Sequence, residues 1–221
     1  MYRKCLCHGL KVDQETVRIL LLIFDPEGVQ LRRGRRLKRR QYYSRGPNWC
    51  WHIDGNDKLS PYGIAIHACI DGFSRYVVWL EANDTNRDPG VVAGYYLKAV
   101  QKRKACPVLV RGDRGTENCF VQTMQTLLRR NHADSLAGDK SFIYGQSTAN
   151  QRIESWWPVL RKHCTQYWMN TFTKLKDEGQ FSGDSLDKNL IAFCFLKLVQ
   201  VIIYTDTNGI IMLDCSCQSS A

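Results

Sequence analysis

The 221-residue sequence predicts an α/β fold, with a mixed five-stranded sheet and helices on both of its faces. Two observations lead to this class. Three apolar segments between residues 49 and 80 follow one another with short turns, which is typical of an antiparallel meander. Beyond them, helical patterns alternate with two further short apolar segments. A strand reached through a helical crossover runs parallel to an earlier strand, so the sheet is expected to be mixed.

A short helical segment precedes the predicted sheet. Asp13 is a suitable N-cap, and Val17, Leu20 and Leu21 recur at helical spacing, so we expect a helix over 13–23. A turn is expected over 25–28, where proline and glycine follow an aspartate. A strongly basic run comes next, and its basic residues are Arg32, Arg33, Arg35, Arg36, Lys38, Arg39 and Arg40.

This basic run has two interpretations. One is a disordered linker or a nuclear-localisation patch, and the other is an arm that lies on DNA phosphates after a helix-turn-helix; the two are compatible. Tyr42 and Tyr43 follow directly, and aromatic rings stack on bases, which favours contact with DNA. We therefore predict a partial helix-turn-helix-like, Arg-rich DNA-binding segment over 1–46 and a nuclear location.

The remaining elements follow from the period of the apolar residues. Gly46-Pro47-Asn48 marks the boundary to a domain expected over 47–205, with an irregular tail over 206–221. Asp71 begins turn chemistry between two strands, so we interpret it as a turn former. Thr148 and Gln151 fit a capping box at the start of a long helix. Strands are expected at 49–54, 63–70, 75–80, 107–110 and 142–144, and helices at 91–103, 118–130, 148–179 and 184–203.

Composition and charge exclude several classes of protein. Hydrophobic residues make up 44% of the chain, which argues against global disorder. The formal net charge of +10 favours a polyanionic partner. The ten cysteines are scattered, so we expect free thiols in a reducing, intracellular compartment rather than a disulfide scaffold. Cys5, Cys7 and His8 leave a partial zinc site open as an alternative, and the apolar run 19–24 is too short to span a membrane.

Three acidic residues stand in settings that suggest a common site. Asp54 and Asp113 each end a short apolar segment, and Glu154 lies near the start of a long amphipathic one. Such strand ends and a helix start can bring three carboxylates together around two divalent cations. Two metal ions about 3.5–4 Å apart can clamp the attacking and leaving oxygens of a phosphodiester. The pattern therefore predicts polynucleotidyl transfer.

Short phrases around these residues carry a resemblance to a known family. They are GPN followed by WHIDG, then CIDGFSR, GTEN, RRNH, STANQRIE and WW. Over about 47–180 the chain resembles the catalytic core of retroviral integrases and DDE transposases, which has a ribonuclease-H-like fold. To about residue 200 it is similar to transposon-derived integrase-core-domain proteins of animal genomes. By that similarity, the N-terminal segment looks like the end of a DNA-binding region that this chain enters partway.

The resemblance implies DNA integration. It assigns Asp54, Asp113 and Glu154 as the catalytic triad and as ligands of two Mg²⁺ or Mn²⁺ ions, with element ends and target duplex DNA as partners and a homo-oligomer as the working form. Gaps of 58 and 40 residues separate the three acids. The second gap is longer than in retroviral integrases, and we expect the loop over 131–140 to absorb the difference.

Several polar residues beside Glu154 are further candidates for contact with nucleic acid. Gln146, Asn150, Gln151 and Arg152 are expected to contact the DNA end or target. Arg161 and Lys162 lie farther along the helix and are either phosphate contacts or part of a solvated face. His52 and His67 alternate with apolar residues in strands and are expected to be structural.

Pro158 leaves open an alternative in which the protein binds DNA with impaired catalysis. Inside a helix, proline removes the hydrogen bond to the carbonyl four residues back, which is that of Glu154, at a cost of about 3 kcal/mol. The resemblance implies a different residue here. One alternative is therefore a domesticated or decayed DNA-binding protein with impaired catalysis. A separate alternative, which does not depend on Pro158, is a ribonuclease-H-type nuclease acting on hybrids, and the Arg-rich run and the family phrases argue against it.

Overall fold

The computed structural model describes residues 2–34, 42–145 and 149–217, with side chains except those of 3, 4, 33 and 206–217. The chain divides into two compact units, 1–42 and 43–221. This division falls close to the boundary that we expect after residue 46.

The first unit contains three short helices, α1 (Tyr2–Cys7), α2 (Gln14–Phe24) and α3 (Pro26–Gly34). Asp13 caps α2 as expected, because its carboxylate accepts hydrogen bonds from the Thr16 amide and hydroxyl. The predicted turn at 25–28 is instead the start of α3. Pro26 occupies the first helical position, where no amide hydrogen is needed, and Asp25 accepts a hydrogen bond from the Gly28 amide.

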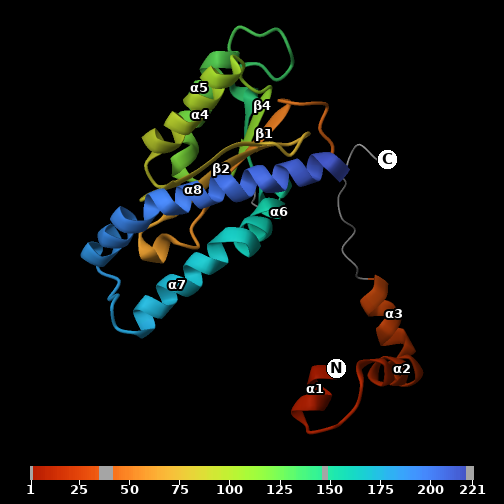
Figure 1. Ribbon diagram of the computed structural model, residues 1–221. Helices are drawn as coiled ribbons and strands as arrows, with labels where there is room; N and C mark the ends of the chain where they lie inside the picture. The colour runs from red at the N-terminus through yellow and green to blue at the C-terminus, as the bar shows by residue number, and fades with distance from the viewer. Residues whose placement is uncertain (1, 35–41, 146–148, 218–221) are drawn as a thin grey trace. The chain divides into compact units, whose positions relative to one another are not determined.

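The second unit is built on one mixed sheet (Figure 1). Its strand order is β3-β2-β1-β4-β5, with antiparallel β1–β2 and β2–β3 pairs and parallel β1–β4 and β4–β5 pairs. The predicted fold class is therefore confirmed. The strands are β1 (Cys50–Asn56), β2 (Ala65–Asp71), β3 (Val77–Asn83), β4 (Leu109–Gly112) and β5 (Phe142–Tyr144).

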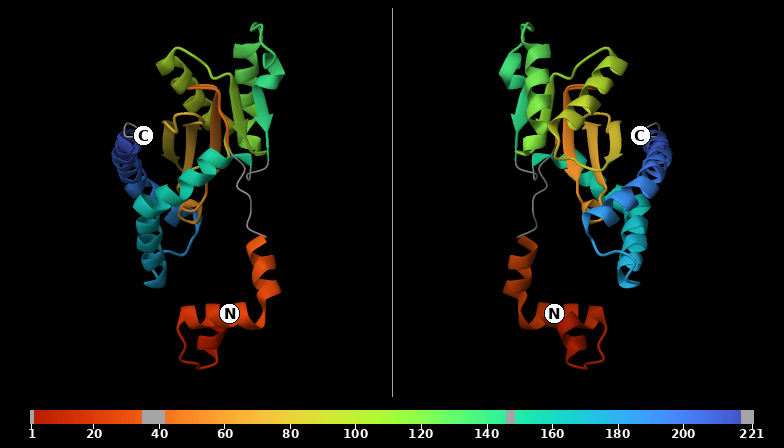
Figure 2. Two further views of the ribbon diagram at one scale, coloured as in Figure 1. Left: turned by 90° about the vertical axis from the view of Figure 1, so that its right-hand side faces the viewer. Right: turned by 90° about the vertical axis from the view of Figure 1, so that its left-hand side faces the viewer.

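Helices cover both faces of this sheet, and Figure 2 shows α7 and α8 on the opposite side of the strands from α5. One core lies beneath α4 and α5 and is centred on Trp51, which contacts Trp79 and Tyr96 edge to face. The other lies beneath α6, α7 and α8 and includes Trp168 and Phe172. These helices are α4 (Pro89–Arg103), α5 (Cys119–Arg129), α6 (Gln151–Leu160), α7 (Gln166–Asp177) and α8 (Ser185–Cys217), with a π-helical segment, η5 (Arg161–Thr165), between α6 and α7.

The last helix is longer than the sequence pattern predicts. α8 continues to Cys217, through most of the region that we expect to be an irregular tail. Gly209 lies inside it, but a single glycine costs only about 1 kcal/mol relative to alanine, and no proline follows. Within the described residues, no helix combines the length and apolar character needed to cross a membrane.

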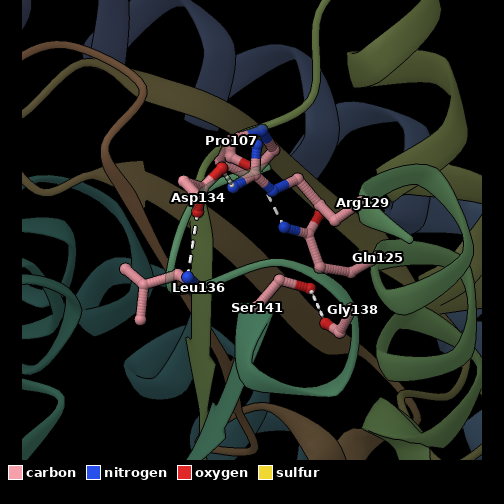
Figure 3. Close-up of polar contacts among 7 residues, drawn as sticks. All are labelled: Pro107, Gln125, Arg129, Asp134, Leu136, Gly138 and Ser141. Carbon is pink, nitrogen blue, oxygen red and sulfur yellow. Dashed lines mark hydrogen bonds and ion pairs between the residues drawn. The ribbon is translucent and has the colours of Figure 1, made fainter. Parts of the chain in front are cut away.

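The loop between α5 and β5 is closed by its own polar contacts (Figure 3). Arg129, which is buried, forms an ion pair with Asp134 at 2.5 Å. Asp134 also accepts a hydrogen bond from the Leu136 amide, and the Ser141 hydroxyl donates to the Gly138 carbonyl. This is the segment that we expect to hold the extra residues between Asp113 and Glu154.

Candidate active site

Asp54 lies on the central strand of the sheet. In the parallel β1–β4 pair, His52 is opposite Arg111, and continuing this register by two residues sets Asp54 opposite Asp113. Asp54 is half-buried, and one of its carboxylate oxygens accepts a hydrogen bond of 2.7 Å from the Trp157 indole N–H. The central strand thus presents a carboxylate whose orientation is fixed by a helix.

Asp113 follows the end of β4 in a tight turn. Its Oδ1 accepts hydrogen bonds from the Gly115 amide at 3.1 Å and from the buried Asn118 side chain at 3.0 Å. Gly112 allows β4 to approach β1 closely, because a Cβ at this position would lie 3.2 Å from Cγ1 of Ile53. Backbone and side chain together therefore hold the Asp113 carboxylate at the same edge of the sheet as Asp54.

Glu154 lies in the first turn of α6, where an acidic residue is favourable. The opposite face of the helix is buried against the sheet through Ile153, Trp157 and Leu160. Because these three side chains fix the rotation of α6, Glu154 faces the pocket that it shares with Asp54. The pocket has a volume of about 460 Å³, and its lining residues are Asp54, Gly55, Asn56, Asp57, Lys58, Glu154, Trp157, Pro158 and Arg161.

The three carboxylates influence one another electrostatically. Burial, together with the charges of Glu154 and Asp113, raises the pKa of Asp54 to about 7. Burial and Asp113 also raise the pKa of Glu154, and burial and the neighbouring carboxylates raise that of Glu117. Among the ion pairs of the described residues, none involves Asp54, Asp113 or Glu154. The acidic side chains of the site are therefore not neutralised by any ion pair among the described residues.

This charge suits a divalent cation, since hard cations take carboxylate oxygens as ligands. Asp54, Asp113 and Glu154 are the residues that could hold one. In the described parts of the chain, however, no group of three His, Cys, Asp or Glu side chains lies close enough together to hold a metal ion, and this includes these three acids. That statement covers Cys5, Cys7 and His8 as well, and the eight cysteines with described side chains are free.

The predicted DNA-contacting residues fall into three groups. Arg161 and Lys162 are exposed, and Arg161 also lines the pocket. Gln151 and Arg152 are half-buried, and Arg152 donates to the Gly72 carbonyl at 3.0 Å. Asn150 is buried, with 1% of its surface exposed, so its side chain faces the protein interior. Their contact with nucleic acid remains a prediction.

The other predicted contacts belong to the basic run or to the segment before α6. Arg32 lies in α3 and forms an ion pair with Asp25 at 3.1 Å, and Arg33 lies in the same helix. The remaining predicted contacts lie outside the described residues, and they are Arg35, Arg36, Lys38, Arg39, Arg40 and Gln146. The expected helix cap Thr148 also lies outside the described residues.

Asp71, His52 and His67 have the structural roles that the sequence predicts. Asp71 is buried and accepts hydrogen bonds from the Asn48 amide and from the amide and hydroxyl of Ser74. Both histidines are fully buried, and burial lowers the pKa of each, to about 4 for His52 and about 3 for His67. Neither imidazole is therefore charged near neutral pH.

Sequence reasoning did not assign a role in the site to Trp157 or Asn118. The sequence predicts Trp157 only as part of the helix over 148–179, yet its N–H contacts Asp54. Asn118 was expected only at the start of a helix, yet its amide contacts Asp113. Trp157 lies three residues after Glu154, and indole nitrogens in a buried stripe need an acceptor, which is the signal that could have revealed it.

Pro158 lies inside α6, as expected, and does not end the helix. The irregularity begins three residues later, where η5 replaces α-helical bonding, and the Arg161 amide donates to the carbonyls of both Pro158 and Trp157. Proline thus leaves the Glu154 carbonyl without its usual amide partner and precedes a change in helical winding.

Comparison with known proteins agrees with this architecture. A family model described as Integrase core domain matches residues 41–205, which is most of the chain. No curated protein matches the sequence. The central β1 and β4 carboxylates, the mixed five-stranded sheet and the family match lead to one conclusion: the chain belongs to the integrase core domain family, with the ribonuclease-H-like fold of that family.

Proposed function

We propose that the protein catalyses metal-dependent polynucleotidyl transfer on DNA, nicking or joining strands as in DNA integration. Asp54, Asp113 and Glu154 are the proposed catalytic residues and the ligands of two Mg²⁺ or Mn²⁺ ions. The observation that carries this proposal is the position of the three carboxylates, which come from β1, the turn after β4, and α6. Burial and the neighbouring acids raise the pKa values of Asp54 and Glu154.

Each part of the site has a separate task in this proposal. The ions, when bound, would activate the attacking oxygen and neutralise charge that develops on the phosphodiester. Trp157 orients Asp54, and the turn of Gly115 and Asn118 orients Asp113. Lys58 and Arg161, on the wall of the same pocket, are positioned to contact phosphates beside the reacting one.

DNA is the proposed partner, both as element ends and as target duplex. Proteins of the integrase core domain family generally bind DNA, and the net charge of +10 supports the same partner here. The basic run supports a nuclear location. A homo-oligomer is supported by exposed apolar side chains along one side of α8, namely Leu186, Leu190, Phe193 and Val201.

An oligonucleotide assay of strand transfer and nicking with Mn²⁺ tests the proposal. Asp113→Asn keeps the oxygen that accepts from Gly115 and Asn118 but removes the charge, so we expect a loss on the order of 100-fold or more. Asp139→Asn, which removes an exposed charge from the loop before β5, is the control and should match the parent.

A second candidate function is DNA binding without catalysis, which the position of Pro158 in the helix of Glu154 favours. The same assay separates the two candidates. Equal inactivity of the parent and Asp113→Asn, with DNA binding intact in both, would overturn catalysis and support the decayed binding protein. A preference for RNA–DNA hybrids over duplex DNA would instead favour a nuclease of the ribonuclease H type.

A further inference from the structure

Asn150 connects the helix of Glu154 to the strand of Asp54. It immediately precedes α6, and its backbone carbonyl accepts the Glu154 amide at 3.2 Å. Its side chain does not cap that helix. Instead, Oδ1 lies 2.7 Å from Nδ1 of His52, and Nδ2 donates to the Ile53 carbonyl at 2.8 Å. His52 and Ile53 are the two residues before Asp54 in β1.

The chemistry of these contacts fixes the orientation of each group. A carbonyl acceptor at Ile53 requires the NH₂ side of the Asn150 amide, so its oxygen must face His52. That oxygen only accepts, so the His52 imidazole carries its proton on Nδ1. Because His52, Ile53 and Asn150 are all buried, water does not compete for these bonds. The side-chain amide of Asn150 thus pairs both with the His52 imidazole N–H and with the Ile53 backbone carbonyl.

A second contact ties α6 to β1 on the other side of Glu154. Asn150 lies four residues before Glu154, and Trp157, whose N–H contacts Asp54, lies three residues after it. The first turns of α6 are therefore anchored at both ends to the strand that carries the other carboxylate. With both anchors in place, Glu154 has little freedom to move relative to Asp54.

We propose that Asn150 is a positioning residue, which acts through His52 and Ile53 to set the distance between Glu154 and Asp54 and hence the affinity of the site for a divalent cation. The inference rests on the proposed function, because it takes those two carboxylates as ligands of one metal site. It assigns the side chain a task inside the protein in place of direct contact with DNA.

Binding of Mn²⁺ alone, followed by the electron paramagnetic resonance signal of the free ion, tests this role without DNA or turnover. Asn150→Leu replaces the amide with an apolar side chain of similar size. We expect its Mn²⁺ affinity to fall by at least about tenfold, as when residues that orient metal ligands are removed. Gln125→Met is the matched control, since Gln125 is an equally buried amide on α5 that bonds to Tyr96 and the Pro107 carbonyl. Figure 3 shows its contact with Pro107.

A merely structural role predicts a different result. Both variants would then lose thermal stability while binding Mn²⁺ as the parent does at a temperature where they are folded, and this outcome would overturn the inference. A parent that binds no Mn²⁺ would overturn the proposed function itself and the inference with it. The two failures are therefore distinguishable.

His52 supplies a second pair of variants in case Asn150→Leu does not fold. His52→Asn keeps an N–H donor near the place of Nδ1, whereas His52→Leu removes it. We expect His52→Asn to retain more of the parent's Mn²⁺ affinity than His52→Leu. Equal affinity in the two variants would show that the bond to Asn150 does not set the geometry of the site.

Discussion

At the scale of single residues, Asp54 is the carboxylate of the site that is affected by burial, by a hydrogen bond and by neighbouring charges at the same time. It lies on the central strand, it accepts the Trp157 N–H, and its pKa responds to two other carboxylates. An aspartate with this environment is costly in the absence of a cation, because its charged form is both desolvated and repelled. The cost should be measurable as a dependence of stability on pH.

We predict that Asp54→Asn flattens the pH profile of thermal stability in the presence of EDTA. Burial and the neighbouring acids raise the pKa of Asp54 to about 7 in the folded protein. The stabilisation from its bound proton is complete below the ordinary carboxyl pKa of about 4 and is lost as the pH rises through about 7. Between pH 5 and pH 8, the melting temperature of the parent should therefore fall more steeply than that of Asp54→Asn. The difference should be about 2–4 °C for each kcal/mol lost from the free energy of unfolding. If melting temperature depended on pH in the same way in the parent and in Asp54→Asn, the raised pKa of Asp54 would be contradicted.

We also predict that Pro158→Ser increases the rate of strand transfer. The replacement returns a backbone N–H that can donate to the Glu154 carbonyl, so α6 regains a regular turn beneath its carboxylate. A misplacement of about 1 Å can cost on the order of 100-fold in rate, which sets the upper limit of the expected gain. Single-turnover rates of the two proteins at saturating Mn²⁺ provide the measurement. An unchanged rate would show that the protein tolerates Pro158 without cost.

At the scale of elements, most of the sheet and its helices could be predicted from periodicity alone. β5 has the expected bounds, and β1 to β4 lie within a few residues of theirs, because each is a short apolar run between turn residues. α1 and α3 were missed, since their few apolar residues are not arranged in a stripe. The contacts of Asp54 with Trp157 and of His52 with Asn150 join residues about a hundred positions apart, and no local pattern encodes them.

The close approach of β4 to β1 gives a prediction for Gly112→Ala. The added methyl would lie 3.2 Å from Ile53, 3.3 Å from Asn118 and 3.4 Å from Phe142. We expect the free energy of unfolding to fall by about 1–3 kcal/mol. Because the strand must shift just before Asp113, strand transfer should fall by on the order of 100-fold.

Gly94→Ala is the matched control for this variant. Gly94 lies in α4, and a Cβ at this position would meet no heavy atom within 4 Å. We expect the control to be neutral or stabilising by up to about 1 kcal/mol, with activity unchanged. Urea denaturation and the strand-transfer assay measure both quantities, and equal behaviour of the two glycine variants would contradict the role assigned to Gly112.

At the scale of the whole molecule, seven basic residues are concentrated between Arg32 and Arg40, while the three proposed catalytic carboxylates lie in the second compact unit. Under the proposed function, this separation would assign most of the DNA affinity to the basic run and the strand transfer itself to the acidic site. Phosphate contacts by the basic run would contribute affinity that depends strongly on salt, and the acidic site would contribute little.

We therefore predict that replacing Arg35, Arg36, Lys38, Arg39 and Arg40 with serine reduces the salt dependence of DNA binding. The slope of log affinity against log salt should fall by about 0.9 for each phosphate contact that is lost. Fluorescence anisotropy over a range of NaCl concentrations measures the slope. Replacing Lys98 and Lys102, which are exposed on α4, together with Lys104, which is exposed directly after it, is the control and should change the slope less. Equal changes would place DNA on α4 as well.

The loop closed by Arg129 and Asp134 has a consequence for how relatives of this protein are found. Residues added there close on themselves before β5 begins, so the chain length between the second and third acids can change without moving either one. Searches that demand a fixed interval between those acids would discard proteins whose sites are intact. A better criterion is the order of the elements and the identity of the turn that follows each strand.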